Sequence, residues 1–212
     1  LLVGAEGKLS KRLGSTGVAE FREQGIEPMA VNSLLARIGT SQPVEARADT
    51  AALAEGFDLS TFGRAPARFD EAELLRLNAQ LVHAMDYAEV ADRLPQGMDE
   101  AAWLTIRPNL ERLGDVQEWW WVVTGPVAAP ALSAEDAAFA GDAADAAAAI
   151  QWDQGAWKAL TETLKQSSGR KGKALFLPLR LALTGMDHGP DMNALLPLIG
   201  KERAVERLRS AA

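Results

Sequence analysis

Two lysines and an arginine surround a serine in the segment GKLSKRLGS, near the start of the sequence. Lys8 and Lys11 stand three residues apart between Gly7 and Gly14, and these glycines predict a loop. In a flexible loop both ammonium groups can reach one polyphosphate, where they stabilise negative charge on a transferring phosphate. Ser10 would add a hydroxyl to the same site. Short basic matches also arise by chance, so the pattern alone does not establish a phosphate site.

The charge of the chain is unevenly distributed. The net charge is −7, which by itself argues against a nucleic-acid partner. Residues 158–212 nevertheless contain ten Lys/Arg against five Asp/Glu, whereas residues 1–157 contain twelve against twenty-four. A basic end on an acidic body is typical of a protein that binds a polyanion with one region only. The alternative is a solvated helix surface, which composition alone favours.

Several classes of site are excluded by composition. No apolar run approaches 18 residues, so no membrane-spanning helix is expected. The absence of cysteine excludes disulfides and thiolate metal sites and fits a cytoplasmic protein. His83 and His188 are far apart in sequence, which makes a poor metal or catalytic pair. The chain has no signal peptide and no initiator Met, which we interpret as an excised piece of a longer protein.

Helical periodicity dominates the sequence and predicts an all-α fold. The clearest helix is expected over residues 69–85, with Asp70 as N-cap and Glu73 completing a capping box. A basic turn, GRKGK, is expected to precede an apolar helix that ends at Gly185. Residues 1–3 indicate the end of a strand whose partners lie outside the chain.

Three separate stretches resemble one family. GKLSKRLGSTGVAEFREQGIEPMAVNSLLARIG closely resembles the bacterial glutamyl-tRNA synthetases, which are class I aminoacyl-tRNA synthetases, at their lysine–x–serine–lysine loop and the helix that follows it. FDEAELLRLNAQLV and PLRLALTG…GP…LLPLIGKERAVERL resemble the middle and the end of the same family. The resemblance covers nearly all 212 residues, and the terminal segment is its most specific part.

The resemblance implies a domain organisation. It implies the loop and the start of a stem-contacting segment in 1–30, a first helical subdomain in 31–123 and a second helical, anticodon-binding subdomain in 137–212. The two prolines, the glycine and the small residues of 124–136 predict a linker between the two subdomains. The Rossmann-like catalytic domain of the family would precede residue 1. The piece alone is therefore expected to be catalytically inactive, although its parent would be a glutamate–tRNA ligase.

The resemblance also implies chemistry for the basic loop. Lys8 and Lys11 would neutralise the phosphates of ATP, bound with Mg²⁺, while glutamate attacks the α-phosphorus to form glutamyl-adenylate. Lys11 is the residue that we assign to the transition state. Ser10 and Arg12 would complete the ATP-binding set; Arg12 departs from the wider class but fits the glutamyl subgroup.

The same resemblance implies a set of residues that bind the anticodon: Arg112, Lys165, Arg180, Gly189, Pro190 and Met192. Arg112 matches a position linked to the first anticodon base, and 189–192 matches the loop that meets the last bases. Anticodon bases are read by splaying, stacking and hydrogen bonding of their edges. Without the resemblance we would interpret Arg112 as a solvated helix arginine and Arg180 as a side chain that snorkels from an apolar helix.

Two further segments have both a functional and a structural interpretation. The cations of 169–173 suit either a contact with the phosphate backbone or a solvated turn. The tryptophans of 119–121 suit a stacking platform, but consecutive helical residues point about 100° apart, so we expect two in the core and one at an interdomain seam. His83 is expected to be structural.

The expected partners are the tRNA for glutamate, ATP and glutamate, with a monomeric, cytoplasmic protein and no membrane. One alternative is an enzyme that also charges the glutamine tRNA. Another is a stand-alone helical RNA-binding module, and a third is a protein-interaction domain whose basic end aids solubility. The second and third alternatives differ in whether the chain binds tRNA with a steep dependence on salt.

Overall fold

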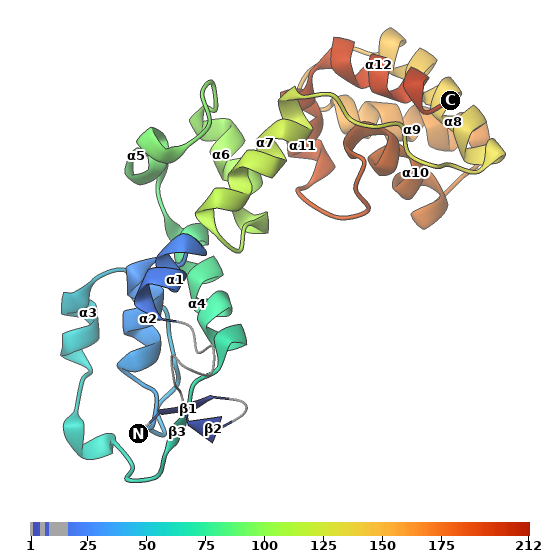
Figure 1. The fold of residues 1–212 in the computed structure, drawn as a ribbon. Helices are drawn as coiled ribbons and strands as arrows, with labels where there is room; N and C mark the ends of the chain where they lie inside the picture. Colours follow the sequence, from blue (N-terminus) through green and yellow to red (C-terminus); the bar gives the residue numbers. More distant parts are fainter. Residues whose placement is uncertain (1, 5–6, 9–16) are drawn as a thin grey trace. The chain divides into compact units, whose positions relative to one another are not determined.

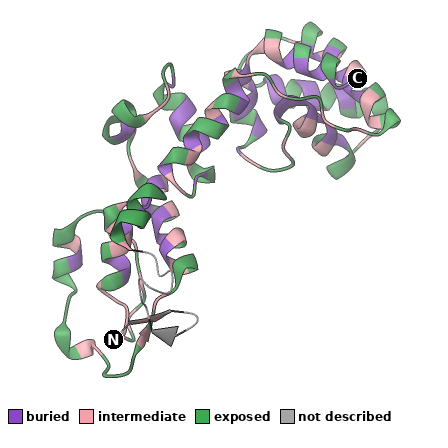
Figure 2. Cartoon of the chain, in the orientation of Figure 1, coloured by how far each residue is buried: buried purple, intermediate pink, exposed green. Residues whose placement is uncertain are grey.

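The computed structural model describes residues 2–4, 7–8 and 17–212, and the chain divides into two compact units (Figure 1). Unit 1 comprises Leu1–Asp92 and Leu110–Asp115, and unit 2 comprises Arg93–Asn109 and Val116–Ala212. Within each unit the buried side chains line the facing sides of the helices (Figure 2). The predicted all-α fold is confirmed, apart from three strands of two or three residues.

Unit 1 is built around two helices, α2 and α4, that pack against each other. Its elements are β1 (Leu2–Gly4), β2 (Gly7–Lys8), α1 (Val18–Glu23), α2 (Pro28–Leu35), α3 (Thr50–Glu55), the 3-10 helix η2 (Leu59–Thr61), β3 (Ala67–Arg68), α4 (Glu71–Ala84), α5 (Tyr87–Val90), and the 3-10 helices η3 (Ala91–Arg93), at its boundary, and η5 (Leu113–Asp115). Its core contains Phe21 and Ile26, with Ala30 and Leu34 from α2 and Leu74, Leu77 and Leu81 from α4. The periodicity of the sequence predicted Leu74, Leu77 and Leu81 on one face of a helix, and the structure confirms this prediction.

The three short strands form a small sheet in the order β2-β1-β3. β1 pairs antiparallel with β2, with Val3 opposite Lys8, and parallel with β3, with Val3 opposite Arg68. The expectation that the first strand has its partners outside the chain was wrong. β3 lies more than sixty residues away in sequence, and two residues without an alternating pattern carry no strand signal.

Helix α4 positions a segment that is distant in sequence. The side chain of buried Asn78 accepts a hydrogen bond from the backbone N–H of Glu27 (2.7 Å) and donates one to the carbonyl of Glu111 (2.7 Å). His83 Nε2 lies 2.8 Å from the carbonyl oxygen of Leu110. Asn78 and His83 thus hold residues 110–115 against α4, which confirms a structural role for His83.

The capping of α4 differs in one respect from the prediction. Asp70 is the N-cap, and its side chain accepts a hydrogen bond from the backbone N–H of Ala72 (2.9 Å). Glu73 instead forms an ion pair with Arg76, at 2.6 Å, three residues further along the helix. Glu73 accepts two hydrogen bonds from Arg76, from Nε at 3.0 Å and from Nη2 at 2.6 Å, and such a bidentate pair between two charged groups is strong.

Unit 2 is a bundle of seven helices among the described residues. They are α6 (Glu100–Ile106), followed by the 3-10 helix η4 (Arg107–Asn109), α7 (Val116–Thr124), α8 (Ala134–Ala149), α9 (Ala156–Ser168), α10 (Lys173–Thr184), α11 (Met192–Ile199) and α12 (Lys201–Ser210). α8 packs against α12, α9 and α10, while α11 contacts α6, α7 and α9. Small side chains on α8, such as Ala140, Ala143 and Ala147, are fully buried and allow this close approach.

The segment expected as a domain linker, 124–136, lies inside unit 2. Residues 126–133 form no helix, in keeping with their prolines, and α8 begins at Ala134 after the N-cap Ser133. The boundaries between the two units lie around residues 93 and 110–115, and the linker stays a prediction. α6 and α7 belong to unit 2 because they pack on α11, more than sixty residues later, and local composition does not reveal such contacts.

Candidate nucleic-acid interface

Helix α10 carries Arg180, the central residue of the expected anticodon set. Its Nη2 donates a hydrogen bond to the carbonyl oxygen of Pro190 (2.9 Å), which ties α10 to the loop before α11. Its Nη1 is buried and has no hydrogen-bond partner. Burial lowers the pKa of Arg180, while the charge of Asp191 acts in the opposite direction. A buried donor without a partner costs roughly 1–3 kcal/mol, so this guanidinium is preorganised at one nitrogen and unsatisfied at another.

The loop before α11 is shaped by a tryptophan of α7. Gly189 has φ +124°, and a Cβ built there would lie 2.6 Å from Cζ3 of Trp119. The ring of Trp119 also meets the ring of exposed His188 edge-on, with centroids 6.2 Å apart. Glycine is required because its backbone runs directly against the indole. The expected residue Gly189 is therefore a packing position as well as a loop position.

The structure separates the side chains of the other two loop residues from solvent. Pro190 is buried, and Met192 is only 4% exposed, in the first turn of α11. Their side chains belong to the core of unit 2. Any contact of theirs with a nucleic acid would be made by backbone atoms, such as the carbonyl of Pro190 that already receives Arg180.

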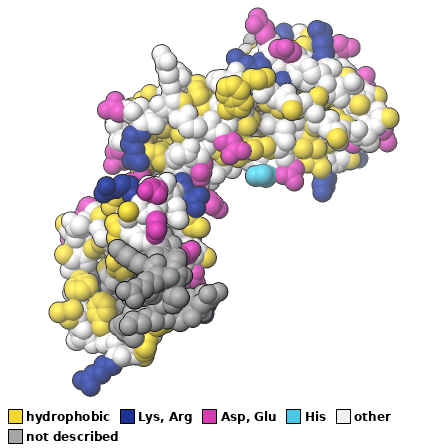
Figure 3. Space-filling model, viewed as in Figure 1, with side chains coloured by type: hydrophobic (Ala, Val, Ile, Leu, Met, Phe, Trp, Pro, Cys, Tyr) yellow, Lys and Arg dark blue, Asp and Glu magenta, His cyan; other side chains and the backbone are white. Residues whose placement is uncertain are grey.

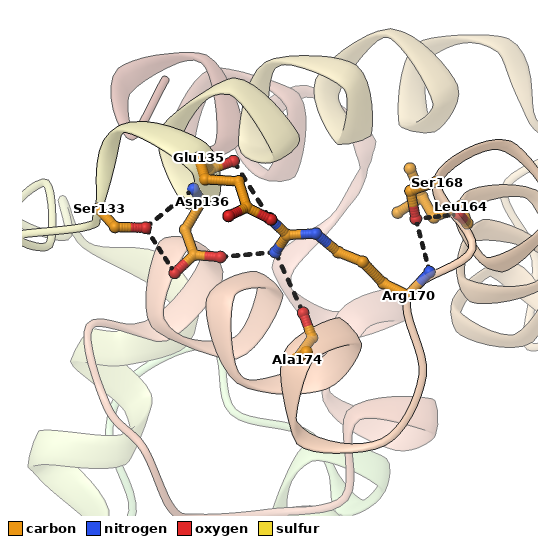
Figure 4. A network of polar contacts seen from close by, with 7 residues as sticks. All are labelled: Ser133, Glu135, Asp136, Leu164, Ser168, Arg170 and Ala174. Carbon is orange, nitrogen blue, oxygen red and sulfur yellow. Dashed lines mark hydrogen bonds and ion pairs between the residues drawn. The ribbon is translucent and has the colours of Figure 1, made fainter.

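Arg170, in the basic turn between α9 and α10, contacts the start of α8 (Figure 4). Arg170 forms ion pairs with Asp136 (2.5 Å) and Glu135 (2.9 Å) at the start of α8, and its guanidinium lies 4.4 Å from the ring centroid of Phe139. Its side chain is only 13% exposed. Arg170 is therefore a structural residue, and it fits neither of the two interpretations of 169–173, a contact with the phosphate backbone or a solvated turn.

A proline explains one more bond of Arg170. Pro178 lies inside α10 and has no N–H for the carbonyl of Ala174, four residues earlier. Arg170 Nη1 donates to that carbonyl oxygen at 3.2 Å. Lys171 and Lys173 of the same turn are exposed, as is Lys165 in the last turn of α9. These three lysines are the cations that this end of unit 2 presents to solvent.

Arg112 lies in unit 1, whereas Lys165, Arg180, Gly189, Pro190 and Met192 lie in unit 2. Its backbone N–H donates to Asp115 (2.8 Å), and its side-chain Nε is buried without a partner. Arg112 lines an open pocket of about 320 Å³, with Phe21, Gln24, Ile26, Glu71, Leu74 and Leu75 as the other lining residues. It is half-buried over Gly25 and is not the freely solvated arginine of the alternative interpretation.

The expected ATP loop falls mostly outside the described residues. Ser10, Lys11 and Arg12 lie outside them, and Lys8 is described only as the end of β2. In the part of the chain that the structure describes, no group of His, Cys, Asp or Glu side chains is arranged to hold a metal ion. Among those residues, no helix is long and apolar enough to cross a membrane.

Sequence reasoning missed Arg207, the most buried cation described in unit 2. It is 6% exposed and donates to the carbonyl oxygens of Leu183 (2.6 Å), Gly125 (2.8 Å) and Val123 (3.3 Å). Burial, assisted by the charge of Arg203, lowers its pKa to about 10, so it stays charged at neutral pH. The signal in the sequence was its place among the apolar residues of KERAVERL.

The tryptophan triplet is also arranged differently from the expectation. Trp119 is buried, Trp120 is half-buried and Trp121 is 60% exposed. One ring, not two, therefore belongs to the core. The ring of Trp121 covers Gly125 at the end of α7, where a Cβ would lie 2.6 Å from the indole.

A family model described as an anticodon binding domain matches residues 105–212, half of the chain. The chain belongs to this anticodon-binding family. All six expected anticodon residues fall within the matched span, and the basic loop of residues 8–12 lies outside it.

Curated relatives and solved structures extend this result. The chain is 67% identical over 212 residues to glutamate–tRNA ligase 1 of Rhizorhabdus wittichii and 64% identical over 208 residues to that of Novosphingobium aromaticivorans. These matches cover 100% and 98% of this chain but 48% and 47% of the relatives, so the chain spans about half of their length. The chain is homologous to glutamate–tRNA ligases and corresponds to their anticodon-binding region.

The fold agrees with a solved structure. A glutamate tRNA ligase from Elizabethkingia meningosepticum, solved in complex with its amino acid, superposes with a TM-score of 0.76. It is 23% identical and covers 100% of this chain, which covers 50% of that one. At this identity the match supports the fold of the anticodon-binding chain only.

Proposed function

We propose that this chain recognises the anticodon of the tRNA for glutamate, as part of an enzyme that activates glutamate with ATP and transfers it to that tRNA. The family and the relatives support a tRNA as the partner. The observation that carries the site is Arg180, held by Pro190 at one nitrogen and unsatisfied at another. A guanidinium carries five N–H donors in a fixed plane, so the donors of half-buried Arg180 that Pro190 does not receive are suited to a base edge.

The neighbouring cations support the same placement. Lys165, Lys171 and Lys173 are exposed near the end of unit 2 that carries the α9–α10 turn. Both signs of charge are scattered over the drawn surface of the two units (Figure 3). Binding by this acidic chain therefore depends on a local cluster of lysines and not on the net charge.

The basic loop is assigned to the other substrate of the proposed enzyme. ATP, with its Mg²⁺, supplies the α-phosphorus that glutamate attacks. Lys8 and Lys11 would neutralise the phosphates, with Ser10 and Arg12 beside them, as the family resemblance implies. Arg112, in unit 1, would contact the anticodon base that the family links to this position.

The test is a titration of the purified chain with a transcript of the glutamate tRNA at two salt concentrations. We expect binding that weakens steeply with salt, because phosphate contacts release counterions. Arg180→Ala should weaken binding about 10- to 100-fold, the worth of a hydrogen bond to a charged group. Arg180→Lys should not restore it fully, because an ammonium cannot form the two parallel bonds.

The matched control is Arg209→Ala, which removes an exposed cation from α12. It should reduce affinity little. Absence of binding by the wild-type chain at low salt would contradict the proposed function and favour a protein-interaction domain. Equal affinity for the glutamine tRNA would broaden the partner to both tRNAs.

A further inference from the structure

The outer face of α10 combines cations with an exposed aromatic ring. Lys173, Phe176, Leu177 and Arg180 recur at helical spacing and therefore lie on one side of the helix. Lys173 and Phe176 are exposed, Leu177 and Arg180 half-buried. At 1.5 Å per residue, the stretch from Lys173 to Arg180 spans about 10 Å along the helix axis, a length comparable to a few stacked bases.

Phe176 is held in place but is not covered. Its ring lies 6.2 Å from the ring of buried Trp157 on α9, at an interplanar angle of 38°. The phenyl side chain is nevertheless 45% exposed. The indole of Trp157 restricts the ring from one side while solvent has access to the rest. A preorganised aromatic ring of this kind binds a flat ligand at low entropic cost because few rotamers are lost.

The charges near Phe176 favour an anionic ligand. Lys173 lies one helical turn before it, and Lys171 is exposed in the preceding turn. Two carboxylates also act on the cations of α10, namely Asp187 on Lys173 and Asp191 on Arg180. Asp187 is bonded to His188, which together with Lys173 lowers its pKa, and Asp191 caps α11 through the N–H of Asn193. Both carboxylates therefore already have hydrogen-bond partners within unit 2.

Trp121, the other large exposed aromatic residue described in unit 2, has no cations in the groove that it lines. Trp121 lines an open groove of about 390 Å³ whose lining residues are apolar or neutral, including Pro126, Val127, Pro130 and Met186, with no Lys or Arg among them. A base stacked there would have no cation of that groove for its phosphate. The combination of a ring and adjacent cations, which single-stranded nucleic acids require, occurs at Phe176.

We propose that one unpaired base of the bound RNA stacks on the ring of Phe176 while the ammonium of Lys173 contacts an adjacent phosphate. This inference rests on the proposed function and adds a division of labour to it. Phe176 contributes affinity for any base, because every base has a π-face. Arg180, one helical turn further, contributes the choice between bases through their edges.

The experiment measures the affinity of the full 212-residue chain for a glutamate tRNA transcript. Phe176→Ala should weaken binding about 5- to 100-fold, the range for loss of one base stacked on an aromatic ring. Phe176→Tyr should retain affinity, and Phe176→Leu, which keeps packing against Trp157, should lose most of it. Thermal melting of each variant identifies any that fail to fold.

Two further measurements separate stacking from charge. Lys173→Ala should reduce the magnitude of the salt slope by about 0.7, the value for one phosphate contact on a single strand, whereas Phe176→Ala should leave the slope unchanged. Transcripts with an abasic nucleotide at each anticodon position in turn should include one that binds the wild type and Phe176→Ala equally well. Trp121→Ala is the matched aromatic control and should bind as the wild type does.

The outcomes distinguish this inference from the proposed function. If the wild type binds tRNA but Phe176→Leu binds equally well, the stacking site is wrong and the proposed function stands. Weakening by Trp121→Ala in place of Phe176→Ala would move the base to the groove of Trp121 and also overturn the inference. If the wild type binds no tRNA at low salt, the proposed function fails, and the inference fails with it.

Discussion

Trp119 leaves no room for a side chain at position 189. The backbone of Gly189 has φ +124°. The carbonyl oxygen of the next residue, Pro190, accepts the hydrogen bond from Arg180. A single glycine thus determines where the guanidinium is held. The same residue was expected from the family resemblance to meet the anticodon, and its position next to Arg180 keeps that prediction open.

Gly189→Ala should destabilise unit 2 because the new Cβ meets the Trp119 ring and the residue is strained at this φ. The expected loss is about 1–3 kcal/mol, or a fall in the melting temperature of several degrees. The tRNA affinity should fall as well, because the loop that holds Arg180 must shift. Gly114→Ala, where a Cβ would meet nothing within 4 Å, is the control. A Gly189→Ala variant that melts with the wild type would contradict this account.

At the scale of elements, largely buried arginines hold the ends of helices. Arg170 joins the α9–α10 turn to the first turn of α8, through Asp136 and Glu135. Arg207 of α12 binds carbonyl groups at the ends of α7 and α10. The carboxyl end of a helix carries partial negative charge, so a buried cation there is partly compensated without a carboxylate partner.

The Asp136–Arg170 pair makes the stability of unit 2 depend on acid pH. The hydrogen bond from Arg170, followed by that from Ser133, lowers the pKa of Asp136 below its ordinary value of 3.8. The folded state thus favours the ionised carboxylate. Its stabilisation is fully present above pH 3.8 and is lost as the pH falls through the lower, folded pKa.

Asp136→Asn should accordingly reduce the free energy of unfolding by about 0.5–1 kcal/mol at neutral pH, the upper range for exposed pairs. The difference from the wild type should shrink as the pH falls from 3.8 through the lower, folded pKa of Asp136, because the wild-type carboxylate then becomes protonated too. Urea unfolding at pH 7 and pH 3 measures both. Asp145→Asn, an exposed carboxylate of the same helix, is the control. A difference of equal size at both pH values would rule out the ion pair as its cause.

At the scale of the whole molecule, the two units carry different parts of the proposed function. Arg112 is in unit 1 with the sheet that contains Lys8, whereas the remaining anticodon residues are in unit 2. Substitutions in unit 2 should therefore change the recognition of tRNA and leave the activation of glutamate unchanged. The relatives are about twice as long as this chain, so activity is a property to test in the longer protein.

In that longer protein, Lys11→Ala should depress ATP–pyrophosphate exchange by about 100-fold, the scale of losing one charge that stabilises the transition state. Its affinity for tRNA should change little. Arg180→Ala, the reciprocal variant, should weaken tRNA binding and leave exchange mostly intact. Exchange at the wild-type level in Lys11→Ala would remove this lysine from its assigned role. Lys158→Ala, an exposed lysine of α9, serves as the control for both measurements.

The sequence by itself determined the features that depend on neighbours along the chain. The helix over 69–85, its N-cap Asp70 and the end of α10 at Gly185 were predicted, because periodicity, capping and glycine act within a few residues. The family resemblance also lay in contiguous motifs, and such motifs can be recognised in the sequence without knowledge of how its segments pack.

Only the tertiary structure decided which charged residues remain available to bind a ligand and which are bonded within the protein. Arg170 is occupied by carboxylates 34 and 35 residues away, and Arg207 by carbonyls more than 80 residues away. The assignment of 93–109 to unit 2 depends likewise on contacts of α6 with α11. Burial and hydrogen bonding of this kind arise between segments distant in sequence, so the residue types alone carried no sign of them.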